Sequence, residues 1–246
     1  MIRHWLGGFS LSAVSSLLID RLRGLDSATL ADVMTAMGLH AQVLSPALRP
    51  TNAACVRSAG TAVCARGSNT PGTTTLPSFR LDDAVTPGSF VVIDTDGCET
   101  GAIIGGNMVA SMLKRGATGF IVDGGIRDFD ELSASGVPVY RRYDTPISAH
   151  GQWKYTSVGE TITLPGIWNP VRISSGDLIL SDSDGIVAVP REHAETIIGY
   201  AERHIESEAA IGRAIAGGES RQVATQNNPR LTYVAPLTTF AAPPNE

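Results

Sequence analysis

The chain has 246 residues, of which 43% are hydrophobic and 17% are charged, a balance typical of a globular protein and not of a disordered one. Its formal net charge is −5 and its Lys and Arg residues form no block, so nucleic-acid binding through a basic face is not expected. No apolar run approaches the length of a membrane span, so we expect no membrane partner either.

The cysteine content indicates a reducing environment. Cys55, Cys64 and Cys98 are odd in number and widely spaced along the chain. Such a set suits a reducing compartment better than a disulfide framework. We therefore expect a cytoplasmic protein.

The N-terminal stretch is compatible with two interpretations. Arg3 and His4 precede an apolar run, as in a secretory signal, but Gly7 and several serines interrupt that run and no small-residue cleavage site stands out. The favoured interpretation is an amphipathic helix over residues 11–25. The residues expected on its apolar face are Val14, Leu17, Leu18 and Leu22.

Helices and strands are expected to alternate between residues 26 and 140. The expected helices cover residues 27–37, 105–116 and 128–135, and the expected strands cover residues 58–66, 90–94, 119–123 and 137–140. Asp26 or Ser27 is the expected N-cap of the first of these helices. The alternation indicates a parallel α/β layer.

The pattern changes after residue 145, where short strands are joined by turns. They are expected at residues 160–164, 171–173, 177–180 and 185–189, in an antiparallel or mixed arrangement. Asp182-Ser-Asp184-Gly185 resembles a carboxylate-rich metal loop, but a hairpin turn is the favoured interpretation. A last helix is expected over about residues 191–216, and the Pro-containing tail after Ser220 is expected to be an arm or disordered.

The last helix has a regular apolar pattern. Ile197, Ala201, Ile205 and Ala209 recur every four residues, which predicts one buried face. No internal repeat and no Pro-rich linker is present in the sequence, so a single domain is expected.

Residues able to carry chemistry are densest at the ends of two predicted strands. Gly105-Gly106-Asn107-Met108 opens one helix, and Arg127-Asp128 follows the strand that ends at Asp123. In α/β sheets the ligand crevice lies at the carboxyl ends of the strands. Arg can grip a carboxylate with two hydrogen bonds, and a lone carboxylate can hold a Mg²⁺ ion that keeps most of its waters. The alternative is that Arg127 and Asp128 form only an ion pair and a helix cap. Judged from these two residues alone, this structural alternative is favoured.

The glycine-rich helix start is open to two interpretations. Its free backbone N–H groups predict an anion site, and close packing of helix on strand explains the same glycines equally well. The spacing matches neither a dinucleotide-binding fingerprint nor a P-loop. The five histidines have no zinc spacing, and Cys98 has no neighbouring base that would make it a nucleophile.

The chain fits the pattern Gly-x20-Arg-Asp-x2-Glu/Asp: Gly106 is followed by twenty residues and then by Arg127-Asp128-Phe129-Asp130-Glu131. In this pattern the chain resembles the RraA-like family. That family includes the 4-hydroxy-4-methyl-2-oxoglutarate and 4-carboxy-4-hydroxy-2-oxoadipate aldolases. Further similar segments lie in the same order along the chain: Thr29-Leu-Ala-Asp32, Gly60-Thr-Ala-Val63, residues 116–124 and residues 176–190. The resemblance spans about residues 25–220, leaving residues 1–24 as an N-terminal helix or extension and residues 221–246 as a C-terminal arm.

The resemblance implies a fold and an activity. The fold would be an α-β-β-α sandwich of the swivelling β/β/α type, assembled as a homotrimer or as a hexamer built of two trimers. The activity would be that of a class II, metal-dependent aldolase that releases pyruvate from a small 2-oxo acid, with oxaloacetate decarboxylation at the same site.

The resemblance also implies roles for individual residues. Asp128 would bind Mg²⁺ or Mn²⁺, and Arg127 would contact the substrate carboxylate. The backbone amides around Gly105, Gly106, Asn107 and Met108 would bind the pyruvate end. A glutamate on the last helix of a neighbouring subunit would act as a base or support one. Glu208 is the best match for this glutamate, and Glu206 is the second choice.

The sequence departs from the family in residues 67–80 and 151–170, the second of which contains Trp153, Pro165 and Trp168. The substrate itself is therefore left open. A non-catalytic protein that binds and regulates a ribonuclease, as some RraA-like proteins do, remains an alternative. The presence of Arg127, Asp128 and Glu131 favours an enzyme over a binding protein, because a protein that only binds need not keep them.

Overall fold

The computed structural model describes residues 16–39, 42–52, 57–70, 72 and 75–237. Its main sheet has the strand order β1-β7-β5-β3-β2-β12-β13, and β9 pairs with β2. The strands are β1 (Arg49–Pro50), β2 (Ser58–Ser68), β3 (Ser89–Asp94), β5 (Gly119–Val122), β7 (Val139–Arg141), β9 (Lys154–Val158), β12 (Leu178–Ser181) and β13 (Ile186–Val189).

The predicted change of strand pattern along the chain is confirmed. The neighbours β2, β3, β5 and β7 run parallel, as the alternation of strands and helices predicts. The later strands β12 and β13 form an antiparallel hairpin, and β12 pairs antiparallel with β2. Asp182 donates its backbone N–H to the carbonyl of Gly185, so this acidic segment is the turn of the hairpin, as favoured.

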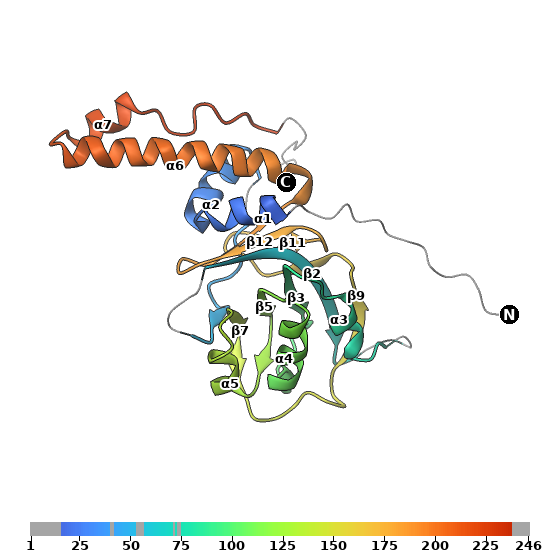
Figure 1. The fold of residues 1–246 in the computed structure, drawn as a ribbon. Helices are drawn as coiled ribbons and strands as arrows, with labels where there is room; N and C mark the ends of the chain where they lie inside the picture. Colours follow the sequence, from blue (N-terminus) through green and yellow to red (C-terminus); the bar gives the residue numbers. More distant parts are fainter. Residues whose placement is uncertain (1–15, 40–41, 53–56, 71, 73–74, 238–246) are drawn as a thin grey trace.

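Helices cover both faces of the curled main sheet (Figure 1). On one face lie α1 (Ser16–Arg23), α2 (Ser27–Ala36) and α6 (Ala194–Ala216), which follows the short η1 (Arg191–His193); on the other lie α3 (Phe79–Ala84), α4 (Gly106–Lys114) and α5 (Phe129–Ser133). A second, two-stranded layer of β10 (Ile162–Leu164) and β11 (Val171–Ile173) shares a buried core with the main sheet. This layering confirms the predicted α/β sandwich.

A three-stranded parallel sheet completes the fold and matters most for the site. It has the order β4-β6-β8, with β4 (Ala102–Ile104), β6 (Gly125–Ile126) and β8 (Tyr143–Asp144). In sequence, β4 leads directly into α4, and β6 leads into α5. The small sheet therefore sets the starts of these two helices next to each other.

Local hydrogen bonds explain where α2 begins. The side chain of Asp26 accepts the backbone N–H of Thr29, so Asp26 is the N-cap, one of the two residues predicted for that role. The buried carboxylate of Asp182 accepts the backbone N–H and the hydroxyl of Ser27 at 2.8 and 2.6 Å. These bonds fix the start of α2 on the β12–β13 hairpin.

Two expected apolar faces need correction. In α1 the side chain of Leu17 is 68% exposed, whereas Ile19 and Leu22 are buried, because α6 and the strands β2 and β12 contact the other face of the helix; Val14 lies outside the described residues. In α6 Ile197 and Ala201 are buried as expected, but Ala209 is exposed. The C-terminal part of α6 extends beyond the sheet (Figure 1), although Ile211 is still buried there.

Of the two expectations for the tail after Ser220, an arm or disorder, disorder is wrong for residues 221–237. α7 (Arg221–Asn227) begins at the N-cap Ser220 and packs along α6. Beyond it, Arg203 lies over the ring of Tyr233, and the backbone N–H of Leu237 donates to the carbonyl of Met37. The tail therefore packs against α6 and α2 as far as residue 237. Among the described residues, no helix is long and apolar enough to cross a membrane.

Candidate active site

A small cavity of about 80 Å³ lies where the starts of α4 and α5 meet the small sheet. It opens beyond the carboxyl ends of the parallel strands, the edge at which α/β sheets bind their ligands. Its lining residues are Ala102, Ile103, Ile104, Gly105, Asn107, Met108, Arg127, Asp128 and Ser148. Most of the predicted site residues are therefore brought together in one place.

Asp128 is held in an unusual backbone conformation. It occupies the N-cap position of α5 with φ 60° and ψ 42°, the left-handed region that Asp and Asn adopt more readily than most residues. Its Oδ2 accepts the backbone N–H of Gly106 at 2.9 Å, and Arg127 Nε lies 3.8 Å from the same oxygen. Both side chains stay nearly half exposed, so a ligand can reach them.

The side chains of the second helix start approach the two glycines closely. A Cβ at position 105 would lie 2.6 Å from Asp128 Oδ2 and 2.9 Å from Arg127 Cγ. A Cβ at position 106 would overlap the carboxylate of Glu131. Close approach therefore explains the glycines, and the alternative that they serve only the packing of helix on strand is incomplete.

The predicted anion site at the start of α4 is only partly available. The N–H of Gly106 is used by Asp128, and the N–H of Met108 donates to the carbonyl of Gly105 at 3.1 Å. Within the described residues, the N–H of Asn107 has no acceptor, and Asn107 is exposed. Of the three backbone donors at Gly106, Asn107 and Met108, only that of Asn107 thus remains for a ligand alongside Arg127.

The donor set at Asp128 fits a weakly held, hydrated divalent ion. In the described part of the chain, no group of three or more His, Cys, Asp and Glu side chains is positioned to hold a metal. Zinc is thereby disfavoured, since it takes three or four protein ligands. Mg²⁺ commonly binds through one or two carboxylates and keeps several waters, and Asp128 Oδ1 accepts no hydrogen bond from the described residues.

Glu208 lies far from this cavity within one chain. It is on α6, which covers the opposite face of the main sheet from α4 and α5 (Figure 1). Its Oε1 forms an ion pair with Arg230 and lies 3.8 Å from the Nε2 of buried His204. Glu206 is on the same helix and is exposed. A role for either at the cavity requires a second copy of the chain and stays a prediction.

A second acidic group at the same sheet edge was not singled out by the sequence. Asp94 ends β3 and lies 3.3 Å from Arg66 Nε, while Arg66 also contacts Asp96 at 3.1 Å. Burial raises the pKa of Asp94, an effect that the N–H of Asp96 and the charge of Arg66 partly oppose. The strand-terminal position of Asp94 was the available signal. For the cavity residue Ser148 there was none, since it lies in an irregular segment.

Cys98 is not a nucleophile in this arrangement. It is buried, and its Sγ lies 3.4 Å from the hydroxyl of Thr100. Burial raises the pKa of the other described cysteine, Cys64, to about 12, so this thiol stays protonated.

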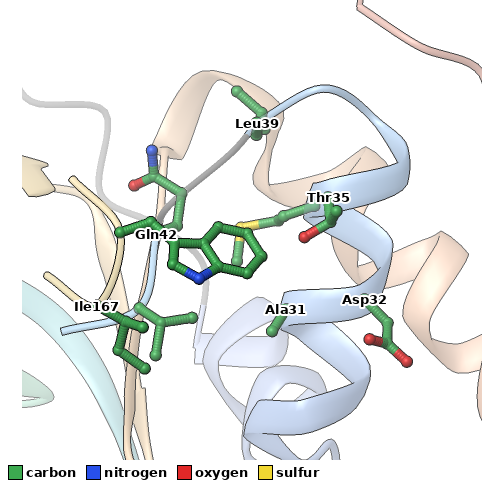
Figure 2. A pocket seen from close by; sticks show the side chains of 9 residues that line it. Ala31, Asp32, Thr35, Leu39, Gln42 and Ile167 are labelled. Carbon is green, nitrogen blue, oxygen red and sulfur yellow. The ribbon is translucent and has the colours of Figure 1, made fainter. Parts of the chain in front are cut away.

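A larger cavity, of about 170 Å³, lies beside α2 (Figure 2). Its lining is mostly apolar and includes Ala31, Leu39 and Ile167, with Asp32 and Thr35 on the α2 side. The carboxylate of Asp32 lies 3.5 Å from Arg230 and 3.9 Å from His204. This cavity contains none of the residues of the Gly-Arg-Asp pattern, so it is not the candidate active site.

Comparison with known proteins gives a family and a fold. A family model described as RraA-like, Aldolase/RraA, matches residues 27–188. A protein of Halalkalibacterium halodurans named "Putative 4-hydroxy-4-methyl-2-oxoglutarate aldolase" is 35% identical over 130 residues, which are 53% of this chain and 60% of that protein. A similarly named protein of Albidiferax ferrireducens is matched over 55% of its length, so the match covers less than two thirds of these relatives.

Solved structures agree on the fold. An uncharacterized protein from Pseudomonas syringae pv. tomato has a TM-score of 0.76 at 24% identity, with 91% of this chain and 100% of that chain covered. Streptomyces coelicolor RraAS2, described as an unusual member of the RNase ES inhibitor RraA protein family, has a TM-score of 0.69 at 25% identity. In that comparison 79% of this chain and 96% of the other are covered.

Proposed function

The chain belongs to the RraA-like family, and on that premise we propose that it is a divalent-metal-dependent lyase. It cleaves a 4-hydroxy-2-oxo acid, of the 4-hydroxy-4-methyl-2-oxoglutarate or 4-carboxy-4-hydroxy-2-oxoadipate type, by a retro-aldol reaction that releases pyruvate. The same site decarboxylates oxaloacetate. The cofactor is Mg²⁺ or Mn²⁺, since both prefer oxygen ligands.

One observation carries the proposal. Asp128 is fixed by the N–H of Gly106 in a cavity that also holds the free N–H of Asn107 and the guanidinium of Arg127. A carboxylate for a metal, a cation and an amide donor thus meet within a space suited to a small acid. The aldolase names of several relatives support the same chemistry.

Each residue has a defined task. Asp128 would hold the ion, which when bound supplies Lewis-acid polarisation of the 2-oxo group. Arg127 binds the substrate carboxylate, and the N–H of Asn107 donates to an oxygen at the same end. Their positive character also stabilises the negative charge that develops on the substrate as the carbon–carbon bond breaks.

The two reactions differ in what leaves. In the retro-aldol reaction a base takes the proton of the C4 hydroxyl, the C3–C4 bond breaks, and its electron pair passes toward the 2-oxo group. In oxaloacetate, carbon dioxide leaves instead and that base is not needed. One arrangement of Arg127 and Asp128 therefore serves both reactions.

The direct test is the release of pyruvate from 4-hydroxy-4-methyl-2-oxoglutarate and from oxaloacetate, with Mg²⁺ and with EDTA. We expect metal-dependent release that is lost in Asp128→Ala. A folded, metal-loaded protein that releases no pyruvate from either compound would contradict the proposal.

A binding protein that regulates a ribonuclease is the second candidate. It is favoured by the structural likeness to the RraA protein of Streptomyces coelicolor. A pull-down of a ribonuclease that survives Asp128→Ala, together with no pyruvate release, would place this candidate first. We propose a homotrimer or a hexamer for either function and a cytoplasmic location.

A further inference from the structure

Ser148 is the polar residue of the candidate cavity that has no task in the proposed function. It lies between β8 and β9 and pairs in parallel with Ala102, the first residue of β4. Main-chain bonds hold this pairing: Ala102 donates its N–H to the carbonyl of Ile147 at 2.7 Å, and Ala149 donates its N–H to the carbonyl of Ala102 at 3.0 Å. The backbone, and not the hydroxyl, therefore fixes the place of Ser148 beside the cavity.

The hydroxyl of Ser148 has an unused donor. Its Oγ accepts the backbone N–H of His150 at 3.2 Å, and within the described part of the chain its own hydroxyl proton has no acceptor. A hydroxyl that accepts one hydrogen bond becomes a better donor of the next, because hydrogen bonds in a chain polarise one another. Ser148 can therefore donate to an oxygen of a ligand in the cavity.

The register of the small sheet separates Ser148 from the other polar residues of the cavity. Residues 147–149 pair with one side of β4, and β6 pairs with the other side. The last residue of β4 pairs with Ile126 of β6, which Arg127 and Asp128 follow directly. The backbones of Ser148 and β6 are thus two strand spacings, about 10 Å, apart. A ligand held at one end by Arg127 must extend past β4 to reach Ser148.

The proposed substrates have the length and the acceptor that this arrangement requires. Their C1 carboxylate and 2-oxo group form one end, and C4 with the terminal carboxylate forms the other end. With the first end at Arg127 and Asp128, the terminal carboxylate lies on the Ser148 side of β4. We propose that the hydroxyl of Ser148 donates a hydrogen bond to this terminal carboxylate and so binds the fragment that leaves. The proposal rests on the proposed function and adds a specificity-determining residue to it.

This hydrogen bond acts on binding and not on bond breaking. In the retro-aldol reaction the C3–C4 bond breaks and its electron pair passes toward the 2-oxo group. The C4 hydroxyl loses its proton and becomes a carbonyl, and C3 then takes up a proton to complete pyruvate. The terminal carboxylate keeps its charge throughout and leaves as part of a second 2-oxo acid. A bond to it is therefore equally strong in the substrate and in the transition state, so it lowers KM without changing kcat.

The test uses two substrates that differ only at the terminal carbon. 4-Hydroxy-4-methyl-2-oxoglutarate ends in a carboxylate, and 4-hydroxy-4-methyl-2-oxopentanoate ends in a methyl group. We expect Ser148→Ala to raise KM for the first about tenfold or more at unchanged kcat, because a hydrogen bond to a charged group is lost. KM for the second stays unchanged, and Ser148→Thr, which keeps a hydroxyl, retains the wild-type KM for both. An equal change for the two substrates, or no change for either, would overturn the proposal.

Thr145→Ala is the matched control. The hydroxyl of Thr145 accepts the N–H of Ile147, two residues further on, at 3.3 Å. This is the same local bond that the hydroxyl of Ser148 makes, but Thr145 does not line the cavity. We expect Thr145→Ala to leave both KM values unchanged. A rise in KM for the dicarboxylate equal to that of Ser148→Ala would assign the effect to the conformation of this segment and would contradict the proposal.

A binding measurement separates the proposal from the proposed function. Calorimetric titration in the presence of Mg²⁺ compares 2-oxoglutarate with 2-oxopentanoate, neither of which has a C4 hydroxyl, so neither undergoes retro-aldol cleavage. We expect Ser148→Ala to weaken the binding of 2-oxoglutarate about tenfold or more and to leave that of 2-oxopentanoate unchanged. This result without pyruvate release in the assay would count against the proposed function alone. Unchanged binding of 2-oxoglutarate by Ser148→Ala, or no binding of it by the wild type, would overturn the proposal.

Discussion

The carboxylate of Glu131 lies against the Cα of Gly106, so closely that a Cβ at position 106 would overlap its Oε2. The two residues are distant in sequence, yet the starts of α4 and α5 bring them into contact. The glycine and the acidic residue of the Gly-x20-Arg-Asp-x2-Glu/Asp pattern are thus two halves of one packing contact. The spacing of the pattern reflects the path from one helix start to the next.

This contact predicts a coupling between the two positions. Because the clash is with the flexible end of Glu131, we expect Gly106→Ala to displace that side chain and to lower the free energy of unfolding by about 1 kcal/mol. In a Glu131→Ala background the same alanine should be neutral or stabilising, since Ala favours a helix over Gly. Urea unfolding of the four proteins measures the coupling.

Gly199→Ala serves as the control for this cycle. Gly199 lies in α6, where an added Cβ would meet no atom within 4 Å, so alanine there should stabilise by about 0.5–1 kcal/mol in either background. An equal effect of Gly106→Ala with and without Glu131 would refute the proposed contact.

Because Asp128 is in the left-handed conformation, its replacement by Asn can separate its structural role from the role of its charge. Asn adopts this conformation readily and can still accept the N–H of Gly106, so Asp128→Asn should keep nearly the stability of the wild type. Ala lacks both advantages, and Asp128→Ala should lose about 1–2 kcal/mol. Thermal or urea unfolding measures both variants. If Asp128→Asn is as unstable as Asp128→Ala, the carboxylate is needed for folding itself, and the interpretation of Arg127–Asp128 as a structural ion pair gains support.

The buried Asp182 predicts a pH dependence of stability. Desolvation acts to raise the pKa of this carboxyl, but hydrogen bonds from Ser27, Asp184 and Gly185 outweigh it, so that the pKa is lowered in the folded state. A lowered pKa contributes stability above the unfolded value of about 4, and this contribution is lost as the pH falls through the folded value. Asp182→Asn should therefore destabilise the protein at pH 7 and flatten the loss of stability below pH 4.

Urea unfolding at several pH values between 7 and 3 measures this effect. Asp20→Asn on α1 is the control, because its ion pair with Arg23 is exposed and such pairs contribute little. A parallel pH dependence of Asp182→Asn and the wild type would contradict the assignment.

If Glu208 acts in the reaction, as the resemblance implies, its location predicts that a complete site needs two subunits. Since Glu208 and Asp128 lie on opposite sides of the main sheet of one chain, a contribution of Glu208 to catalysis must come from another copy. We expect Asp128→Asn and Glu208→Gln each to be inactive in the retro-aldol assay. Co-expressed, they should regain part of the activity through mixed sites.

As the control, the two variants are purified separately and mixed only after each has assembled. Subunits then no longer exchange, so mixed sites do not form and activity should not return. Activity of Glu208→Gln equal to that of the wild type would remove Glu208 from the reaction. Glu131, which contacts Gly106 within the same chain, would then be the next carboxylate to test as the base.

Most elements of the fold follow from local patterns, and the misses have physical causes. The buried strands β3 and β5 are continuous apolar runs, and the N-cap of α2 is an Asp at the expected place, so both are readable from sequence. The strands β4, β6 and β8 were not expected, because they are only two or three residues long and gain their stability from pairing with one another. The helix α7 was missed because a proline-rich sequence follows it.

The site was predictable where its residues lie in one sequence pattern, and not where they reach the cavity through tertiary contacts. Gly105, Asn107, Arg127 and Asp128 lie in a recognisable pattern, and the cavity brings them together. Ser148 carries no such pattern, because it reaches the cavity through its pairing with Ala102, which is distant in sequence. The use of the Gly106 N–H by Asp128 likewise depends on tertiary contact and not on local sequence.

The most direct test of the proposed activity is the release of pyruvate from oxaloacetate and from 4-hydroxy-4-methyl-2-oxoglutarate by the wild type and by Asp128→Asn, each with Mg²⁺ and with EDTA. Asp128→Asn is the sharper variant because it is expected to keep the fold while removing the charge that would hold the ion. We predict Mg²⁺-dependent turnover in the wild type and its loss in the variant. Equal turnover by the two proteins, or no turnover by a folded and Mg²⁺-loaded wild type, would contradict the assignment of Asp128 to a metal-dependent lyase.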